Sequence, residues 1–221
     1  MVFGKDRVCS LILAASDGNL ARITKLVECG ADPNMPDGAG DRPLAAAVRA
    51  EQDRAAKLLV RLGADPDLPG INGKPAIFYP AARGNIETAR FLLEAGADPN
   101  SKDETGVSVL MLSMVAACTN VAAILAERGA DPNVCDKNGY TPLHLAAQMG
   151  EVSLMKKLIV AGANIYAPNL SGWTPLSIFR EVHPALSEIH VEEILELSSE
   201  SKRLKKEDKA GATATGYEFD I

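Results

Sequence analysis

A five-residue motif recurs along this chain at a fixed interval. GADPN begins at Gly30, Gly96 and Gly129, a near copy, GADPD, begins at Gly63, and a weaker one, GANIY, begins at Gly162. Successive glycines are always 33 residues apart (63−30, 96−63, 129−96 and 162−129). A constant period of this size is typical of solenoids, in which each repeat buries its apolar surface only against its neighbours. The interval therefore predicts a stack of structural repeats.

The clearest unit, residues 136–168, predicts two helices joined by a turn. Thr141 is a favourable N-cap residue, and Pro142 follows at the first helical position, where its missing N–H removes no hydrogen bond. Gly150 ends this first helix, and Gly162 ends a second one as a C-terminal cap in the left-handed region. The second helix carries apolar residues at helical spacing, namely Val152, Met155, Leu158 and Ile159.

The segment TPLHLAA, residues 141–147, resembles the ankyrin repeat family, whose 33-residue unit carries T-P-L-H-x-A. The resemblance implies an all-α repeat fold, an α-solenoid of helix-turn-helix units joined by β-hairpin-like loops. We place an ankyrin repeat domain over residues 1–201, with the first and last repeats as caps, and expect residues 202–221 to form a charged, flexible C-terminal tail. The six repeats are expected to cover residues 4–36, 37–69, 70–102, 103–135, 136–168 and 169–201.

The repeated Asp and Asn of GADPN could bind a ligand or shape the backbone. In the first copy, Gly30 leaves the helix and Pro33 prevents its continuation. Asp32 can bond nearby backbone N–H groups, and Asn34 tolerates turn geometry. A calcium loop would need a Glu and a Gly at set distances, and these do not follow. The motif is therefore interpreted as scaffold.

Composition narrows the class of partner. The net charge is −6, whereas binding through phosphate neutralisation needs the opposite sign, so we expect no nucleic acid partner. No apolar run approaches the ~20 residues that span a bilayer, so we expect no membrane partner. Cys9, Cys29, Cys118 and Cys135 lack C-x-x-C spacing and lie among small apolar residues, which predicts buried thiols in a reducing compartment. We expect a cytoplasmic protein, monomeric by itself, with the nucleus or a host cytosol as the other locations considered.

Residues suited to catalysis or metal binding are sparse. His144 lies in the TPLH motif, where the resemblance implies a structural histidine that bonds the backbone of the adjoining hairpin. His183 and His190, followed by Glu192 and Glu193, could suggest a metal cluster but match no H-E-x-x-H arrangement. No glycine-rich phosphate loop, nucleophile elbow or Cys/His signature is present. We therefore expect no enzyme activity, no cofactor and no metal.

Positions at which the repeats differ are the candidates for partner binding. Ankyrin proteins, as the resemblance implies, bind partners through hairpin tips and the exposed face of the first helix. At those positions the early repeats present charge, and the later ones present Val, Tyr, Met and Trp, which suit a binding hot spot. The alternative for Trp173 is that it packs under the C-terminal cap. The predicted site is centred on repeats four to six with a charged rim, and comprises Arg49, Lys74, Arg83, Val107, Val115, Lys137, Asn138, Tyr140, Gln148, Met149, Leu170 and Trp173.

Two repeats and the C-terminus depart from the pattern. Pro80 falls inside the first helix of repeat three, where it should remove a hydrogen bond and kink the chain, either for function or as tolerated decay. Pro184 should break the first helix of repeat six, with VEEILEL forming a displaced final helix. The C-terminal YEFDI resembles a PDZ-type ligand with Phe219 and Ile221 in the pockets. The tail is thus either a motif or a flexible end.

The sequence favours a noncatalytic protein–protein interaction module, an adaptor or an inhibitor, that binds a protein partner through hairpin tips and the concave helix face. Two alternatives stay open. A secreted bacterial effector with host-mimicking repeats would share the fold and differ in its source organism. An enzyme would need a site in the atypical C-terminal region, at His183, His190 or Glu193.

Overall fold

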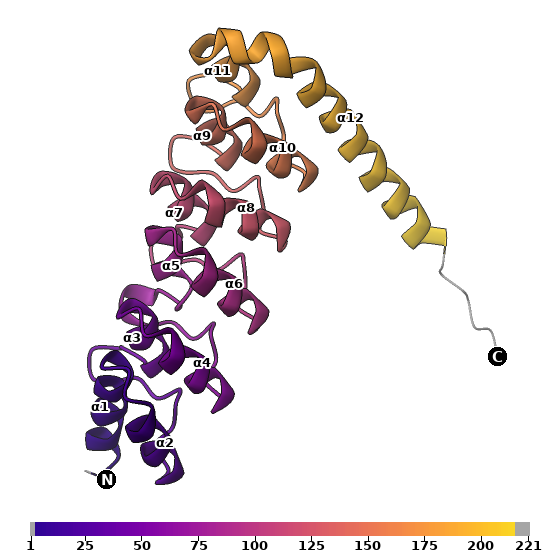
Figure 1. Ribbon diagram of the computed structural model, residues 1–221. Helices are drawn as coiled ribbons and strands as arrows, with labels where there is room; N and C mark the ends of the chain where they lie inside the picture. The colour runs from indigo at the N-terminus through magenta and orange to yellow at the C-terminus, as the bar shows by residue number, and fades with distance from the viewer. Residues whose placement is uncertain (1–2, 215–221) are drawn as a thin grey trace, which may run out of the picture. The chain divides into compact units, whose positions relative to one another are not determined.

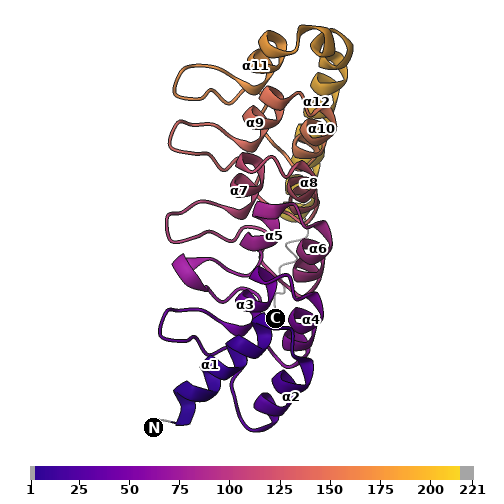
Figure 2. The ribbon, with the colours of Figure 1, turned by 60° about the vertical axis from the view of Figure 1, so that its left-hand side comes forward.

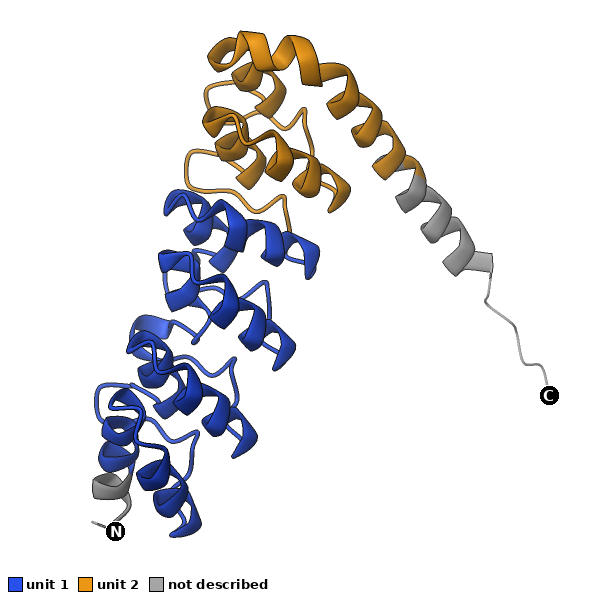
Figure 3. Ribbon diagram, viewed as in Figure 1, with its two compact units in different colours: residues 1–130 blue, residues 131–221 orange. Residues whose placement is uncertain are grey.

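The computed structural model describes the backbone of residues 3–214 and the side chains of residues 8–201 and 203. Within this part the chain forms twelve α-helices and one short 3₁₀ helix. None of these residues lies in a β-strand, and only an isolated antiparallel bridge joins Lys102 to Ser108. The predicted all-α repeat fold is confirmed. The chain divides into two compact units, residues 1–130 (unit 1) and 131–221 (unit 2) (Figure 3).

Unit 1 consists of four helix pairs (Figure 1). The first helices of the pairs are α1 (Phe3–Ser16), α3 (Pro43–Arg49), α5 (Phe78–Arg83) and α7 (Val109–Val115). The second helices are α2 (Leu20–Glu28), α4 (Asp53–Arg61), α6 (Ile86–Glu94) and α8 (Thr119–Glu127), and the short helix η1 spans Ile71–Gly73. In Figure 2 the first helices of this unit stack on one another, the second helices lie beside them, and the connecting loops project to one side.

Unit 2 contains two further helix pairs. They are formed by α9 (Pro142–Met149), α10 (Val152–Val160), α11 (Pro175–Val182) and α12 (Pro184–Ala214). The predicted break at Pro184 is confirmed, because α11 ends at Val182 and α12 begins at Pro184 and packs on both α10 and α11. Buried Ile194 and Ser198 lie on its packed face. The helix continues past residue 201 to Ala214, and the proposed YEFDI motif lies outside the described residues.

The second helices repeat in strict register. Helices α2, α4, α6, α8 and α10 each have nine residues and begin 33 residues after the one before (53−20, 86−53, 119−86 and 152−119). Alanines such as Ala47, Ala56 and Ala147 are fully buried, which allows neighbouring helices to approach closely. Larger aliphatic residues, Leu59 and Leu158 among them, complete a core with few aromatic rings. The 33-residue period of the sequence is therefore also the period at which the second helices recur.

The GADPN motif forms the exit from each second helix. Gly30 adopts a φ of 87°, in the left-handed region, and the carboxylate of Asp32 accepts the backbone N–H of Asn34 at 2.8 Å. The Asn34 side chain also reaches the next repeat, where it donates to the carbonyl of Gly63 and accepts the N–H of Asp65, each at 2.8 Å. The motif thus shapes one turn and joins it to the next. Its interpretation as scaffold is confirmed.

The prediction of a kink at Pro80 is wrong. By the 33-residue register α5 should begin at Ala76, but it begins at Phe78 and the preceding turn is tight, with the N–H of Phe78 bonded to the carbonyl of Pro75. Pro80 therefore lies in the first turn of α5, where a backbone N–H has no partner within the helix. Pro80 therefore removes no hydrogen bond within this helix.

The prediction of buried cysteines is also wrong. Cys9, Cys29 and Cys135 are exposed and Cys118 is half-buried. Small apolar neighbours in the sequence do not determine which way a side chain faces. Cys29 follows the end of α2 as its C-cap residue, and Cys135 lies in a loop, so neither belongs to an apolar helix face. Among the helices described, none is long and apolar enough to cross a bilayer.

Candidate functional site

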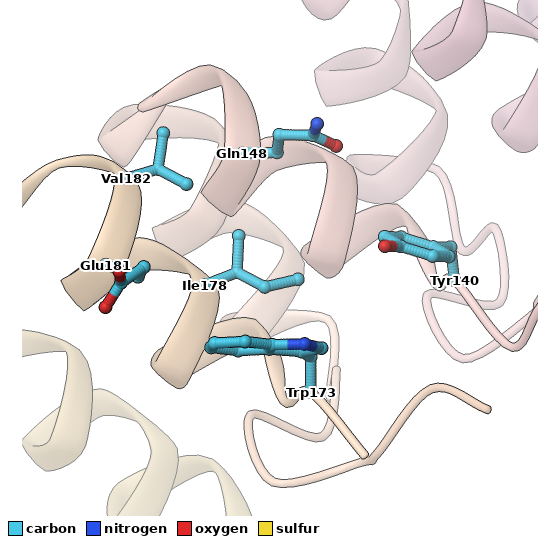
Figure 4. Close-up of a pocket in the computed structure, with 6 residues that line it drawn as sticks. All are labelled: Tyr140, Gln148, Trp173, Ile178, Glu181 and Val182. Atoms are coloured by element: carbon cyan, nitrogen blue, oxygen red, sulfur yellow. The ribbon is translucent and has the colours of Figure 1, made fainter. Parts of the chain in front are cut away.

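A hollow of about 190 Å³ lies on the surface of unit 2 (Figure 4). Two lining residues come from the ends of hairpin loops, one from α9 and three from α11. Four of the lining residues form two equivalent pairs. Tyr140 and Trp173 occupy the same position in consecutive repeats, and so do Gln148 and Glu181 (173−140 and 181−148 are both 33). The complete lining is Tyr140, Gln148, Trp173, Ile178, Glu181 and Val182.

The backbone of Trp173 is held on both sides. Its N–H donates to the Oδ1 atom of Asn169 at 2.9 Å, and its carbonyl accepts the N–H of Asn169 at 2.8 Å, which closes the turn. The same carbonyl lies 3.0 Å from the Nε2 atom of His144 in the preceding repeat. The indole ring therefore projects from a fixed turn.

His144 is completely buried and links α9 to that turn. Its Nδ1 atom accepts the N–H of Thr141 at 3.0 Å, which assigns the ring proton to Nε2 and makes Nε2 the donor to Trp173. Burial lowers the pKa of His144, because the charged form would lose hydration. The structural role that the family resemblance implied for this histidine is confirmed.

The other wall of the hollow is one face of α11. Thr174 and Pro175 fix the start of this helix through a capping box and a proline in the first turn. Ile178, Glu181 and Val182 follow at i, i+3 and i+4, and such residues lie on the same side of a helix. None of these three belongs to the site predicted from the sequence.

The hollow combines apolar surface with exposed polar groups. Trp173 is 45% exposed and Val182 49% exposed, whereas Ile178 is buried. The exposure of Trp173 does not fit the alternative in which its ring packs under the C-terminal cap. Glu181 is exposed and makes no ion pair with a described residue. Such a surface can hold a small apolar group while offering hydrogen bonds at its edge.

Comparison with known proteins identifies the family. The family profile described as ankyrin repeats (3 copies) matches residues 11–103 and 110–179, most of the chain. The chain is an ankyrin repeat protein. The interval between the two matches, residues 104–109, covers the hairpin and helix start of repeat four, where SVLM replaces the TPLH pattern. Ankyrin repeats are protein-interaction modules, and that general role applies to this chain.

A solved structure supports the same assignment. The ankyrin repeat domain of Bcl-3, described as a unique member of the IkappaB protein family, is similar with a TM-score of 0.70 and 27% sequence identity. The similarity covers 83% of this chain and 85% of the Bcl-3 chain. No curated protein matches in sequence. In all, 552 chains of solved structures match, so the ankyrin fold by itself does not select a partner.

The other residues of unit 2 that were predicted to bind a partner do not line the hollow. Leu170 is 81% exposed at the hairpin tip, where its N–H donates to the carbonyl of Asn138 at 3.0 Å. Lys137 is exposed on the neighbouring tip, and Met149 is half-buried at the end of α9. The structure therefore brings together Tyr140, Gln148 and Trp173 from the predicted set.

The predicted residues of unit 1 are of two kinds. Val107 and Val115 are exposed, at 40% and 75%, and Lys74 is half-buried. The two arginines of the predicted rim are already engaged. The guanidinium of Arg49 bonds the buried carboxylate of Asp41 and lies 5.8 Å from the ring centre of Tyr79. Arg83 bonds the backbone carbonyl of Arg49 and the carboxylate of Glu51. The bond to Asp41 raises the pKa of Arg49.

The residues considered for metal binding or catalysis have other contacts. The Nε2 atom of His183 lies 2.9 Å from the carbonyl of Gln148, at the end of α9. Glu193 pairs with Lys156 at 2.6 Å and lies 3.6 Å from the Nδ1 atom of His190. The hydrogen bond from Lys156 lowers the pKa of Glu193. Within the described residues, no three His, Cys, Asp or Glu side chains come together as a metal site would require.

Proposed function

We propose that this ankyrin repeat protein is a noncatalytic adaptor or inhibitor that binds a protein partner at the hollow of unit 2. The observation that carries the proposal is the half-exposed ring of Trp173 on a turn whose backbone is fixed by Asn169 and His144. A large side chain on a rigid turn loses little conformational entropy when a partner covers it. Tryptophan and tyrosine are also the residues most enriched in binding hot spots.

The position of the hollow fits the expected mode of binding. Its lining combines hairpin residues with one face of the first helices, α9 and α11. Exposed Leu170 extends the apolar surface at the hairpin tip. In unit 1, Val107 and Val115 are also exposed apolar residues. Arg49 is less suited to the rim, since its guanidinium is already bonded to Asp41.

Affinity capture with mass spectrometry tests this proposal. The wild-type chain and the double variant Tyr140→Ala/Trp173→Ala are immobilised and exposed to the same cell lysate. A hot-spot residue contributes ~2 kcal/mol or more to binding, equivalent to roughly 30-fold in Kd, so we expect the double variant to lose the partner. Circular dichroism of both proteins checks that the fold is retained.

The matched control is Tyr166→Ala. Tyr166 is 52% exposed and belongs to the same unit, but it does not line the hollow. This variant should capture the partner as the wild type does. Equal capture by wild type and by the Tyr140→Ala/Trp173→Ala variant would show that the partner binds elsewhere and would refute the proposed site.

A further inference from the structure

Glu181 is the one charged residue among the six that line the hollow. Its carboxylate is exposed and has no cationic partner among the described residues. Arg180, the preceding residue, does not line the hollow, and the imidazole of His183 is bonded to the carbonyl of Gln148. The net charge of the chain is −6, which also attracts a cationic partner from solution. The electrostatic character of the hollow is therefore negative.

The apolar part of the hollow lies between two polar ends. Figure 4 shows Trp173 and Ile178 in the middle, with Glu181 on one side and Tyr140 on the other. The indole N–H of Trp173 donates to no described residue, so it is available to a carbonyl of the partner. An occupant that covers Trp173 thus has an apolar contact at its centre and a carboxylate at one end.

The size of the hollow limits what can enter. A volume of about 190 Å³ equals roughly six water molecules. This space accepts one aliphatic side chain and the end of a second side chain. In an extended segment, residues i and i+2 project to the same side, so a pair spaced in this way can enter together.

We infer that the partner presents an extended segment in which an aliphatic residue contacts Trp173 and Ile178 and a Lys or Arg two residues away pairs with Glu181. The inference rests on the proposed function and specifies the chemistry of its partner. The aliphatic side chain supplies most of the buried apolar surface. The cation selects the segment and its direction, because exposed ion pairs contribute more to specificity and association rate than to affinity.

A random peptide library displayed on phage tests the inference with the full chain as bait. Peptides are counter-selected on the Tyr140→Ala/Trp173→Ala variant, so that only ligands of the hollow remain. We expect enrichment of sequences with Lys or Arg two residues from Leu, Ile, Val or Met. Enrichment of acidic or uncharged sequences overturns the inference, as does the absence of any peptide that prefers the wild-type chain.

The contribution of Glu181 is then measured by titration calorimetry with the best selected peptide. Glu181→Gln should weaken binding by about threefold and reduce its dependence on salt, as expected for an exposed ion pair. Glu188→Gln is the matched control, because Glu188 is an exposed glutamate of the same unit that does not line the hollow. A selected peptide whose cation is replaced by Glu should regain affinity for the Glu181→Lys variant.

The results separate this inference from the proposed function. If the Tyr140→Ala/Trp173→Ala variant loses the natural partner while Glu181→Gln changes neither affinity nor salt dependence, the hollow is the binding site and the inferred cation is wrong. If neither the double variant nor Glu181→Gln affects binding of the natural partner, the proposed function fails as well. Equal effects of Glu181→Gln and Glu188→Gln would indicate a long-range field and would also overturn the specific pairing.

Discussion

His144 and Phe78 occupy the same position in two repeats (144−78 is twice 33), and both are buried. Only the imidazole can bond the carbonyl of Trp173 and accept the N–H of Thr141 at the same time. At this position a phenyl ring fills the space, but it cannot hold the neighbouring turn. The difference at this position therefore affects how firmly the turn that carries Trp173 is held.

The lowered pKa of His144 predicts a stability that depends on pH. Its ordinary pKa is 6.5, and the folded state holds it below that value, so near and below pH 6.5 the unfolded chain binds the proton more readily. The free energy of unfolding of unit 2 should therefore be highest above pH 6.5, where His144 is neutral in both states. It should decrease as the pH falls from 6.5 toward the pKa of His144 in the folded state. Urea unfolding at a series of pH values, followed by the fluorescence of Trp173, measures this.

The matched variants are His144→Gln and His190→Gln. Glutamine keeps a donor for the carbonyl of Trp173 but does not titrate, so His144→Gln should remove a part of the pH dependence. His190 is partly exposed and takes no part in the bonds that hold the turn of Trp173. A pH dependence that His144→Gln leaves unchanged would show that other groups cause it.

At the scale of the helix, the ends of the first helices share an unusual backbone conformation. Residues at the same position in successive repeats adopt positive φ values, namely Gly18 (67°), Glu51 (57°), Gly84 (73°), Ala117 (55°) and Gly150 (71°). Glycine adopts this region at no steric cost, whereas a residue with a Cβ atom is strained there. The repeat that carries Ala117 therefore stores strain that the glycine repeats avoid.

Ala117→Gly should stabilise unit 1. Relief of the left-handed strain should exceed the added entropy of the unfolded chain and raise the free energy of unfolding by about 0.5–1 kcal/mol. The urea midpoint measured by far-UV circular dichroism checks this. Ala116→Gly is the matched control, because Ala116 has a φ of −77° and the same change there should destabilise. If both variants destabilise, the backbone at Ala117 is not strained.

At the scale of the whole chain, the buried His144, whose pKa is lowered, and the single tryptophan both lie in unit 2. Lowering the pH should therefore weaken this unit more than unit 1. At about pH 5.5 the urea transition followed by Trp173 fluorescence should precede the transition followed by far-UV circular dichroism, which reports both units. Coincident transitions at all pH values would show that the two units unfold as one cooperative body.

Much of the architecture could be predicted because every repeat of a solenoid uses similar residues to begin and end its helices. The TPLH and GADPN patterns fix helix starts and ends through capping and left-handed glycines, and these depend on a few adjacent residues. Pro80 and the cysteines were misjudged because their outcome depends on a shift of two residues in a helix start or on the direction of a side chain. Such details are set by packing between repeats.

The candidate site was predicted in part for a similar reason. Comparing equivalent positions found Tyr140, Gln148 and Trp173, because the fixed period places each of them against its neighbour. It did not select Ile178, Glu181 or Val182, whose contribution depends on where the face of α11 meets the ring of Trp173. A search for i, i+3 and i+4 neighbours on that helix would have found them.

The constant length of the second helices has a consequence for the gene that encodes them. Helices α2, α4, α6, α8 and α10 begin and end at the same phase of the 33-residue period. An unequal crossover between two copies therefore adds or removes whole repeats and leaves every helix pair intact. The residues within each repeat keep their places, but the hairpin tips at the junction gain a new neighbour. Recombination can thus place a different tip beside Trp173 without disturbing the scaffold that supports it.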